Sequence, residues 1–164
     1  MNEVLIGLDI GTTNTKAVAV TLKGELAAEA SRRTPVQALG PGSGVHDPQE
    51  LWTAICGALQ ELTSSLPPKA KPLGLATASM GEAGVPLSDS GEALYPFIIW
   101  HDVRPQAQME SWESNFGARE TYLRTGLPLN PMWSVMKLMW LAENEPEVFS
   151  AMRRWLCVED FAIW

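Results

Sequence analysis

The feature that most limits how this chain can fold stands at its beginning, where two apolar runs are joined by a short polar turn. The first run, VLIGL at residues 4–8, has no polar side chain, and residues 15–21 alternate larger side chains with small ones. Asp9 follows the first run, and Gly11-Thr12-Thr13 separates it from the second. This pattern predicts two strands joined by a turn, with a carboxylate near the end of the first strand.

Three further strands are expected along the chain. Lys23-Gly24-Glu25 is a turn signal, so a third antiparallel strand is expected directly after it. Gly40 to Gly44 is rich in glycine, and we expect it to be a loop without regular structure. The expected strands are Leu26 to Pro35, Leu73 to Ser79 and Leu94 to Trp100, the last two buried.

Helices account for most of the remaining chain. Asp47 is a preferred N-cap residue, Pro48 suits the first helical position, and Glu50 follows three residues after the cap. These signals predict a helix that begins at Pro48 and ends before Pro67-Pro68. Strands followed by helices in this order are typical of an α/β fold. Further helices are expected over residues 105–116, 120–125, 133–144 and 147–154.

Composition and charge exclude several classes of protein. With 164 residues, 46% of them apolar, the chain can bury one ordinary core. A net charge of −7 and an isoelectric point near 4.8 argue against nucleic acid or a membrane surface as the partner. Cys56 and Cys157 lack metal-ligand spacing, and no segment has the pattern of a signal peptide or membrane span. We therefore expect a cytoplasmic protein.

The turn between the first two strands has the chemistry of a phosphate site. Gly11 has no Cβ, so backbone N–H groups can approach an anion closely. Thr12 and Thr13 add hydroxyl donors, and Lys16 adds a positive charge. Asp9 would repel a phosphate directly, but it is suited to hold a magnesium ion that bridges phosphates. The simpler alternative is a plain hairpin with a threonine-rich turn.

Five stretches of the sequence resemble, in order, motifs of the FGGY family of carbohydrate kinases, which belongs to the actin-like ATPase superfamily. Together they cover essentially the whole chain. The stretches are GLDIGTTNTKAVAV, VHDPQELW, GLATASMGEAGVPLSDSGEALYPFIIWHDVRP, TGLPLNPMWSVMKLMWLAENEP and WLCVEDFAIW.

The resemblance implies a kinase that transfers the γ-phosphoryl group of ATP to a hydroxyl of a sugar, sugar acid or polyol. It implies a ribonuclease-H-like α/β fold, a mixed sheet with flanking helices, of which residues 1–164 form the incomplete front part of the first domain. By resemblance, Asp9 organises Mg²⁺, and Gly11, Thr12 and Thr13 face the β- and γ-phosphates of ATP. Lys16 matches a basic position of the same motif.

The resemblance also implies a set of substrate-binding residues. Trp100 would pack on the carbon chain of the sugar, and Glu82 matches an acid that follows the corresponding strand in glycerol kinases. Those enzymes have a tyrosine near Met132, which weakens glycerol as the substrate and favours a ketopentose or a sugar acid, as in xylulokinases and gluconokinases. The implied substrate-binding residues are Glu82, Trp100, Asp102, Arg104, Met132 and Trp133.

Structural alternatives stand beside several of these roles. Arg104 is equally suited to be a structural partner of Asp102, and Glu82 to be a solvated turn residue. Helical spacing indicates a core role for Trp133, Met136, Trp140 and Leu141.

The family's catalytic base is an aspartate of a later motif, and no residue up to Trp164 matches it. We therefore expect no catalytic residue in this chain and no phosphate transfer by these residues alone. An apolar patch left uncovered would allow a homodimer. The alternative function is a non-enzymatic sugar- or phosphate-binding fragment, or a subunit completed by another chain.

Overall fold

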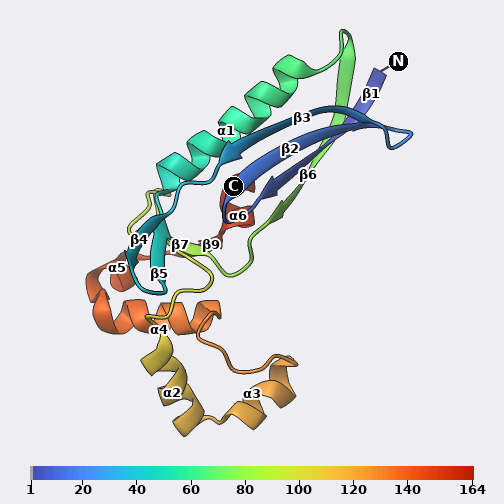
Figure 1. Ribbon diagram of the computed structural model, residues 1–164. Coiled ribbons are helices and arrows are strands. Elements are labelled where there is room, and N and C mark those ends of the chain that lie inside the picture. The colour runs from blue at the N-terminus through green and yellow to red at the C-terminus, as the bar shows by residue number, and fades with distance from the viewer. Residues whose placement is uncertain (1) are drawn as a thin grey trace. The chain divides into compact units, whose positions relative to one another are not determined.

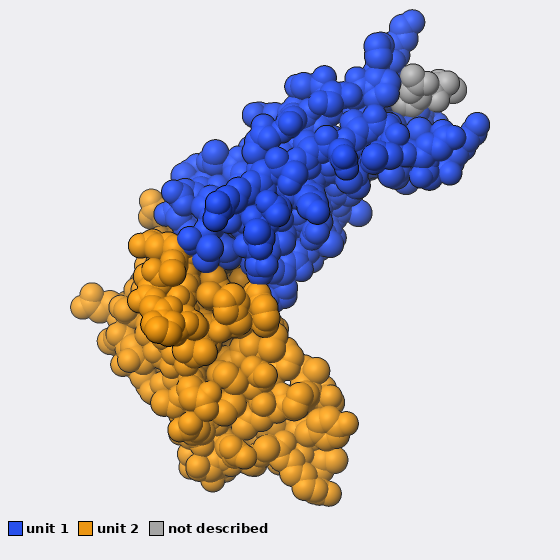
Figure 2. Space-filling model, viewed as in Figure 1, with its two compact units in different colours: residues 1–36, 46–81, 158–164 blue, residues 37–45, 82–157 orange. Residues whose placement is uncertain are grey.

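The computed structural model describes residues 2–164, which form two compact units (Figure 2). Unit 1 is made of residues 1–36, 46–81 and 158–164, and unit 2 of residues 37–45 and 82–157. In the described residues, no helix has the length and apolar character needed to cross a membrane.

Unit 1 is built on a mixed sheet with the strand order β3-β2-β1-β6. The pairs β1–β2 and β2–β3 are antiparallel, whereas β6 runs parallel to β1. Helix α1 lies along one face of this sheet (Figure 1). The elements are β1 (Asn2–Ile10), β2 (Asn14–Thr21), β3 (Leu26–Arg33), α1 (Pro48–Ser65), β6 (Ala70–Ser79) and α6 (Val158–Ile163).

The core of unit 1 lies between the sheet and α1, because every second residue of β1 is apolar and buried. Helix α1 begins as predicted: an Asp47 carboxylate oxygen accepts hydrogen bonds from the amides of Gln49 (2.8 Å) and Glu50 (3.0 Å). The apolar residues of α1 recur every three to four positions and are buried against the sheet. The buried residues of β1 and α1 include Val4, Ile6, Leu8, Ile10, Leu51, Ile55 and Leu62.

The prediction that residues 73–79 form a buried strand is correct about the strand and wrong about its burial. The strand exists as β6, but Leu73 is 47% and Leu75 is 50% exposed. In the described chain β6 is an edge strand, paired only with β1. An apolar run marks a strand without revealing whether both faces are covered.

Unit 2 is built on a second sheet, with the strand order β4-β5-β8-β7-β9, together with four helices. Buried Val85, Leu87, Phe97 and Ile98 of its strands and Met136 and Leu141 of α4 contribute to its core. Its elements are β4 (Gln37–Gly40), β5 (Ser43–His46), β7 (Gly84–Leu87), β8 (Phe97–Ile98), α2 (Gln106–Asn115), α3 (Ala118–Thr125), α4 (Ser134–Asn144), α5 (Pro146–Ala151) and β9 (Arg154–Cys157).

Three predictions in unit 2 are wrong in detail. Residues 40–44 are not an irregular loop, because β4 and β5 form a hairpin around them. Gly42, at φ 72°, lies in the turn, where glycine adopts a backbone conformation that disfavours other residues. The strand expected over residues 94–100 is reduced to β8, and the expected helix over 147–154 ends at Ala151, before β9.

Candidate functional site

Asp9 and Lys16 lie side by side on the sheet of unit 1. They are partners in the register of β1 and β2, so their side chains lie on the same face of the sheet. Both are exposed. They line a hollow of about 380 Å³, together with apolar and small residues of β1, β2 and β6. The carboxylate of Asp9 and the ammonium of Lys16 are therefore the charged groups of an open hollow whose other lining residues are largely apolar.

The turn after β1 is tightly closed at Gly11. The amide of Gly11 donates to the carbonyl of Asn14 at 3.0 Å, and a Cβ on Gly11 would lie only 3.0 Å from the same oxygen. Thr12 is half-buried and Thr13 is exposed; the Thr13 carbonyl accepts from the amide of Thr34 at 2.9 Å. Glycine is thus favoured in this close turn, and its amide already donates a hydrogen bond within the turn. We refer to Asp9, Gly11, Thr12, Thr13 and Lys16 as the phosphate turn.

The phosphate turn fits a magnesium ion that is held mainly by a nucleotide. Within residues 2–164, no group of three or more His, Cys, Asp or Glu side chains forms a metal-ligand cluster. Asp9 is the one carboxylate that lines the hollow. Mg²⁺ is commonly held by one or two carboxylates together with water and substrate phosphates, and Asp9 supplies a carboxylate of that kind.

Glu82 follows β6 in a backbone conformation that is rare for this residue type. Its φ is 62°, in the left-handed region. Its Oε2 accepts hydrogen bonds from the amide (2.6 Å) and the hydroxyl (2.9 Å) of Ser134, the first residue of α4. A carboxylate at a helix N-terminus is favoured by the helix dipole. Glu82 is therefore a half-buried turn residue that is bound to the beginning of α4 rather than fully solvated.

Trp100, Met132 and Trp133 are half-buried residues of unit 2. The indole of Trp100 lies against the ring of His101, with 4.7 Å between centroids. The Met132 amide donates to Asn130 Oδ1 (2.9 Å), and the Trp133 indole N–H donates to the carbonyl of Pro128 (2.9 Å). These contacts order the segment before α4. We refer to Glu82, Trp100, Met132 and Trp133 as the candidate sugar wall.

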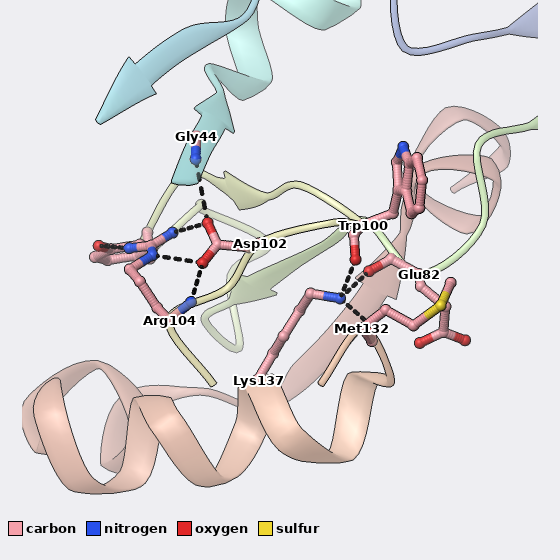
Figure 3. A network of polar contacts seen from close by, with 8 residues as sticks. Gly44, Glu82, Trp100, Asp102, Arg104, Met132 and Lys137 are labelled. Atoms are coloured by element: carbon pink, nitrogen blue, oxygen red, sulfur yellow. Dashed lines mark hydrogen bonds and ion pairs between the residues drawn. The ribbon is translucent and has the colours of Figure 1, made fainter. Parts of the chain in front are cut away.

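Buried Asp102 and half-buried Arg104 form an ion pair in unit 2 (Figure 3). Asp102 Oδ1 accepts from the amide and Nε of Arg104, both at 2.9 Å. Its Oδ2 accepts from Arg104 Nη2 (2.9 Å) and from the amide of Gly44 (3.2 Å). Both carboxylate oxygens are therefore bonded within the protein, as the structural alternative for Arg104 expects.

Arg104 is held on its other side as well. Its Nη1 donates to the hydroxyl of Tyr95 (3.1 Å), and its guanidinium lies 4.7 Å from the centroid of the Trp140 ring. Burial alone would lower the pKa of Arg104, but the hydrogen bond and the charge of Asp102 outweigh burial and raise the pKa above its ordinary value. This pair links the segment of residues 102–104 to α4 and β5.

Lys137 lies in one of the stretches that resemble family motifs but was assigned no role from the sequence; its buried ammonium contacts three separate backbone segments of unit 2. It donates to the carbonyls of Glu82 (2.7 Å), Trp100 (3.5 Å) and Met132 (Figure 3). Burial lowers the pKa of Lys137 to about 8, against the opposing charges of Glu82, Asp102 and Cys157. A lone lysine within the apolar stretch WSVMKLMWL is the sequence signal that points to it.

Comparison with known proteins gives consistent results. The chain matches the model of the N-terminal domain of the FGGY family of carbohydrate kinases over residues 4–164. Apulose kinase of Pectobacterium atrosepticum is 32% identical over 164 residues, which cover 98% of this chain and 33% of that protein. Glycerol kinase of Thermus brockianus is 35% identical over 145 residues, which cover 87% of this chain and 29% of that protein. The crystal structure of xylulose kinase from Rhodospirillum rubrum matches with a TM-score of 0.93 at 31% identity, covering 98% of this chain and 34% of that one.

The mixed sheet and its flanking helices are those of carbohydrate kinases with the actin-like ATPase fold, as the sequence predicts. Within that class, the chain belongs to the FGGY family of carbohydrate kinases. It spans about a third of the length of the curated relatives that it matches.

Proposed function

We propose that the protein is an ATP-dependent carbohydrate kinase, in which residues 1–164 form the front part of the first domain. It transfers the γ-phosphoryl group of ATP to a hydroxyl of a sugar, sugar acid or polyol. The observation that carries the proposal is the phosphate turn: a carboxylate and an ammonium face one hollow beside a Gly-Thr-Thr turn, in a chain of the FGGY family. We also propose a cytoplasmic location, because two isolated cysteines suit a reducing compartment.

The phosphate turn binds the triphosphate of ATP. Lys16 supplies a positive charge to the phosphate oxygens, and Thr12 and Thr13 supply hydroxyl and amide donors. Asp9 is the residue that would hold Mg²⁺, which neutralises charge on the β- and γ-phosphates when bound. Gly11 contributes the close turn, since its own amide donates to Asn14.

The candidate sugar wall binds the acceptor. An indole offers a flat apolar surface to the C–H groups of a sugar, and a carboxylate accepts hydrogen bonds from its hydroxyls. Trp100 and Glu82 supply these two groups, and Met132 and Trp133 lie on the segment that leads into α4. Asp102 and Arg104 act on the sugar through the order that they impose on this region rather than through direct contact.

A ketopentose or a sugar acid is the proposed acceptor class. Met132 stands near the position where glycerol kinases have a tyrosine, which disfavours glycerol. The solved relative from Rhodospirillum rubrum is a xylulose kinase, which supports the ketopentose, whereas the relative from Thermus brockianus is a glycerol kinase, so glycerol is included in the test. The residue that takes the proton from the acceptor hydroxyl is proposed to lie outside residues 1–164.

The test is an assay of the complete protein, purified from a host that lacks its own sugar kinases. It is incubated with ATP, Mg²⁺ and, in turn, D-xylulose, D-ribulose, D-gluconate, L-arabinose, ribitol and glycerol, and ADP release is measured. We expect ADP release that depends on D-xylulose, D-ribulose or D-gluconate and exceeds the release with glycerol. Binding of a sugar without ADP release from any of them would favour the non-enzymatic alternative.

A further inference from the structure

The ammonium group of Lys137 holds together three backbone segments that are far apart in the sequence. It donates to the carbonyls of Glu82, Trp100 and Met132 (Figure 3). An ammonium has three N–H donors and no acceptor, so three carbonyls use its capacity fully. We propose that Lys137 is the positioning residue of the candidate sugar wall, because its ammonium fixes the backbone at three of the four residues that form the wall.

The surroundings of Lys137 favour a role in ordering over a role in net stability. The residue is fully buried, and in the described part of the chain its hydrogen-bond partners are carbonyls rather than carboxylates. Burying a charge in this way is costly, and an apolar side chain of similar length would fill the space without that cost. What the ammonium adds, and a methionine would not, is a fixed position for each carbonyl.

The first turn of helix α4 binds both the side chain and the backbone of Glu82. Ser134, one turn before Lys137, donates to the carboxylate of Glu82, while Lys137 donates to its carbonyl. The backbone of Glu82 is in the left-handed region, which a glutamate adopts only when its surroundings hold it there. The first turn of α4 supplies that support, so the direction of the Glu82 side chain depends on Lys137 as well as on Ser134.

The wall side chains and the Asp102–Arg104 pair lie on different sides of the ammonium. Figure 3 shows the side chains of Glu82, Trp100 and Met132 to one side of Lys137 Nζ and the buried ion pair to the other. Without the ammonium, the three carbonyls of the candidate sugar wall would lose their shared hydrogen-bond donor, whereas the Asp102–Arg104 ion pair would remain. This inference rests on the proposed function, in which the candidate sugar wall binds the sugar.

The test compares Lys137→Met with the wild type and with Lys71→Met, which removes an exposed lysine from β6. In the complete protein, KM for D-xylulose or D-gluconate and KM for ATP are measured between pH 7 and pH 9.5. Hydrogen–deuterium exchange is measured without sugar on peptides that contain residues 82, 100 and 132. The pH series on the wild type needs no substitution, so it remains informative if Lys137→Met does not fold.

We expect Lys137→Met to raise KM for the sugar at least tenfold at pH 7 and KM for ATP less than twofold. Exchange should accelerate in all three peptides and stay unchanged in β1 to β3. In the wild type, KM for the sugar should rise above pH 8, because the neutral amine has two donors for three carbonyls, whereas Lys137→Met should show no such rise. Glu82, Asp102 and Cys157 are the titratable groups that face Lys137, and the matched variant separates their titration from its own.

An unchanged sugar KM with unchanged exchange in the three peptides would overturn the inference, as would an equal rise of both KM values. Failure of the proposed function looks different: the wild type then phosphorylates no sugar. In that case the exchange measurement alone decides whether Lys137 fixes the three segments.

Discussion

At the scale of single residues, unit 2 buries two opposite charges and satisfies them in different ways. The carboxylate of Asp102 is paired with Arg104 and receives a further amide from Gly44. The ammonium of Lys137 donates to three carbonyls. The ion pair links residues 102–104 to β5 and α4, whereas the ammonium joins the backbone segments at Glu82, Trp100 and Met132. The two residues should therefore respond differently to substitution, and only Lys137 should affect the candidate sugar wall directly.

Trp100→Ala should weaken sugar binding without destabilising the fold, whereas Asp102→Asn should destabilise the fold. Trp100→Ala removes the apolar surface for the sugar and should weaken sugar affinity about tenfold, a loss of about 1.4 kcal/mol, with ATP affinity unchanged. Asp102→Asn leaves the guanidinium of Arg104 without its ion-pair partner and should lower the free energy of unfolding by about 3 kcal/mol. Calorimetric titration and urea unfolding measure the two effects. A stable Asp102→Asn protein that had lost sugar affinity would restore Asp102 to direct sugar contact.

Asp9→Asn tests the phosphate turn. In the complete protein, kcat should fall on the order of 100-fold while KM changes little, because the interaction with bound Mg²⁺ matters most in the transition state. The fold should be unaffected, since Asp9 is exposed. Asp89→Asn, in the exposed turn after β7, is the matched control and should retain full activity. A kcat near that of the wild type at saturating ATP and Mg²⁺ would contradict the role of Asp9.

At the scale of elements, one glycine determines how β7 and β9 pack. Gly84 of β7 is paired with Cys157 of β9, and a Cβ on Gly84 would lie 2.2 Å from a ring carbon of Trp155. Such an overlap cannot be relieved without moving the indole. Gly84→Ala should therefore lower the free energy of unfolding by about 1–3 kcal/mol.

The control for that substitution is Gly74→Ala in β6, where a Cβ would meet no atom within 4 Å. Because alanine restricts the unfolded chain more than glycine does, this variant should be as stable as the wild type or slightly more stable. Urea unfolding of both proteins makes the comparison. Equal stability of the two variants would show that Trp155 can move without cost.

The elements that could be predicted are those with local signals. The Asp47 cap and Pro48 mark the beginning of α1, and the alternation in residues 15–21 marks β2. Strands β7 and β9 carry no such signal: each has four residues, and β7 contains Pro86. Their pairing joins residues 84 and 157, and a sequence pattern does not reveal contacts at that separation.

The candidate site likewise has one part that could be predicted from local sequence signals and one part that could not. The phosphate turn could be recognised because its residues lie within eight positions of one another, from Asp9 to Lys16. The role of Lys137 could not, because two of its carbonyl partners lie 55 and 37 residues earlier. Residues that act through distant backbone groups leave no short motif.

At the scale of the whole molecule, unit 1 exposes apolar surface along its sheet. Leu5 is 45%, Leu73 is 47% and Leu75 is 50% exposed. Exposed apolar side chains of this size, next to an edge strand, favour association with another chain. We propose that the purified 164-residue chain forms homodimers or larger assemblies through this sheet, a property that sedimentation velocity at several concentrations measures directly.

These 164 residues alone should not transfer phosphate. In-line transfer requires a held nucleotide, Mg²⁺ and a base or positioning group on the attacking hydroxyl. In the proposed function, the phosphate turn binds the triphosphate and Mg²⁺, and the candidate sugar wall offers a surface for the acceptor. Asp47 is engaged as the cap of α1 and Asp102 is engaged with Arg104, so neither is available as the base. The purified chain, shown to be free of host kinases, is assayed with ATP, Mg²⁺ and the same sugar panel, with the complete protein as positive control. Sugar-dependent ADP release from the chain itself would place a competent base within residues 1–164 and contradict the proposed division of the enzyme.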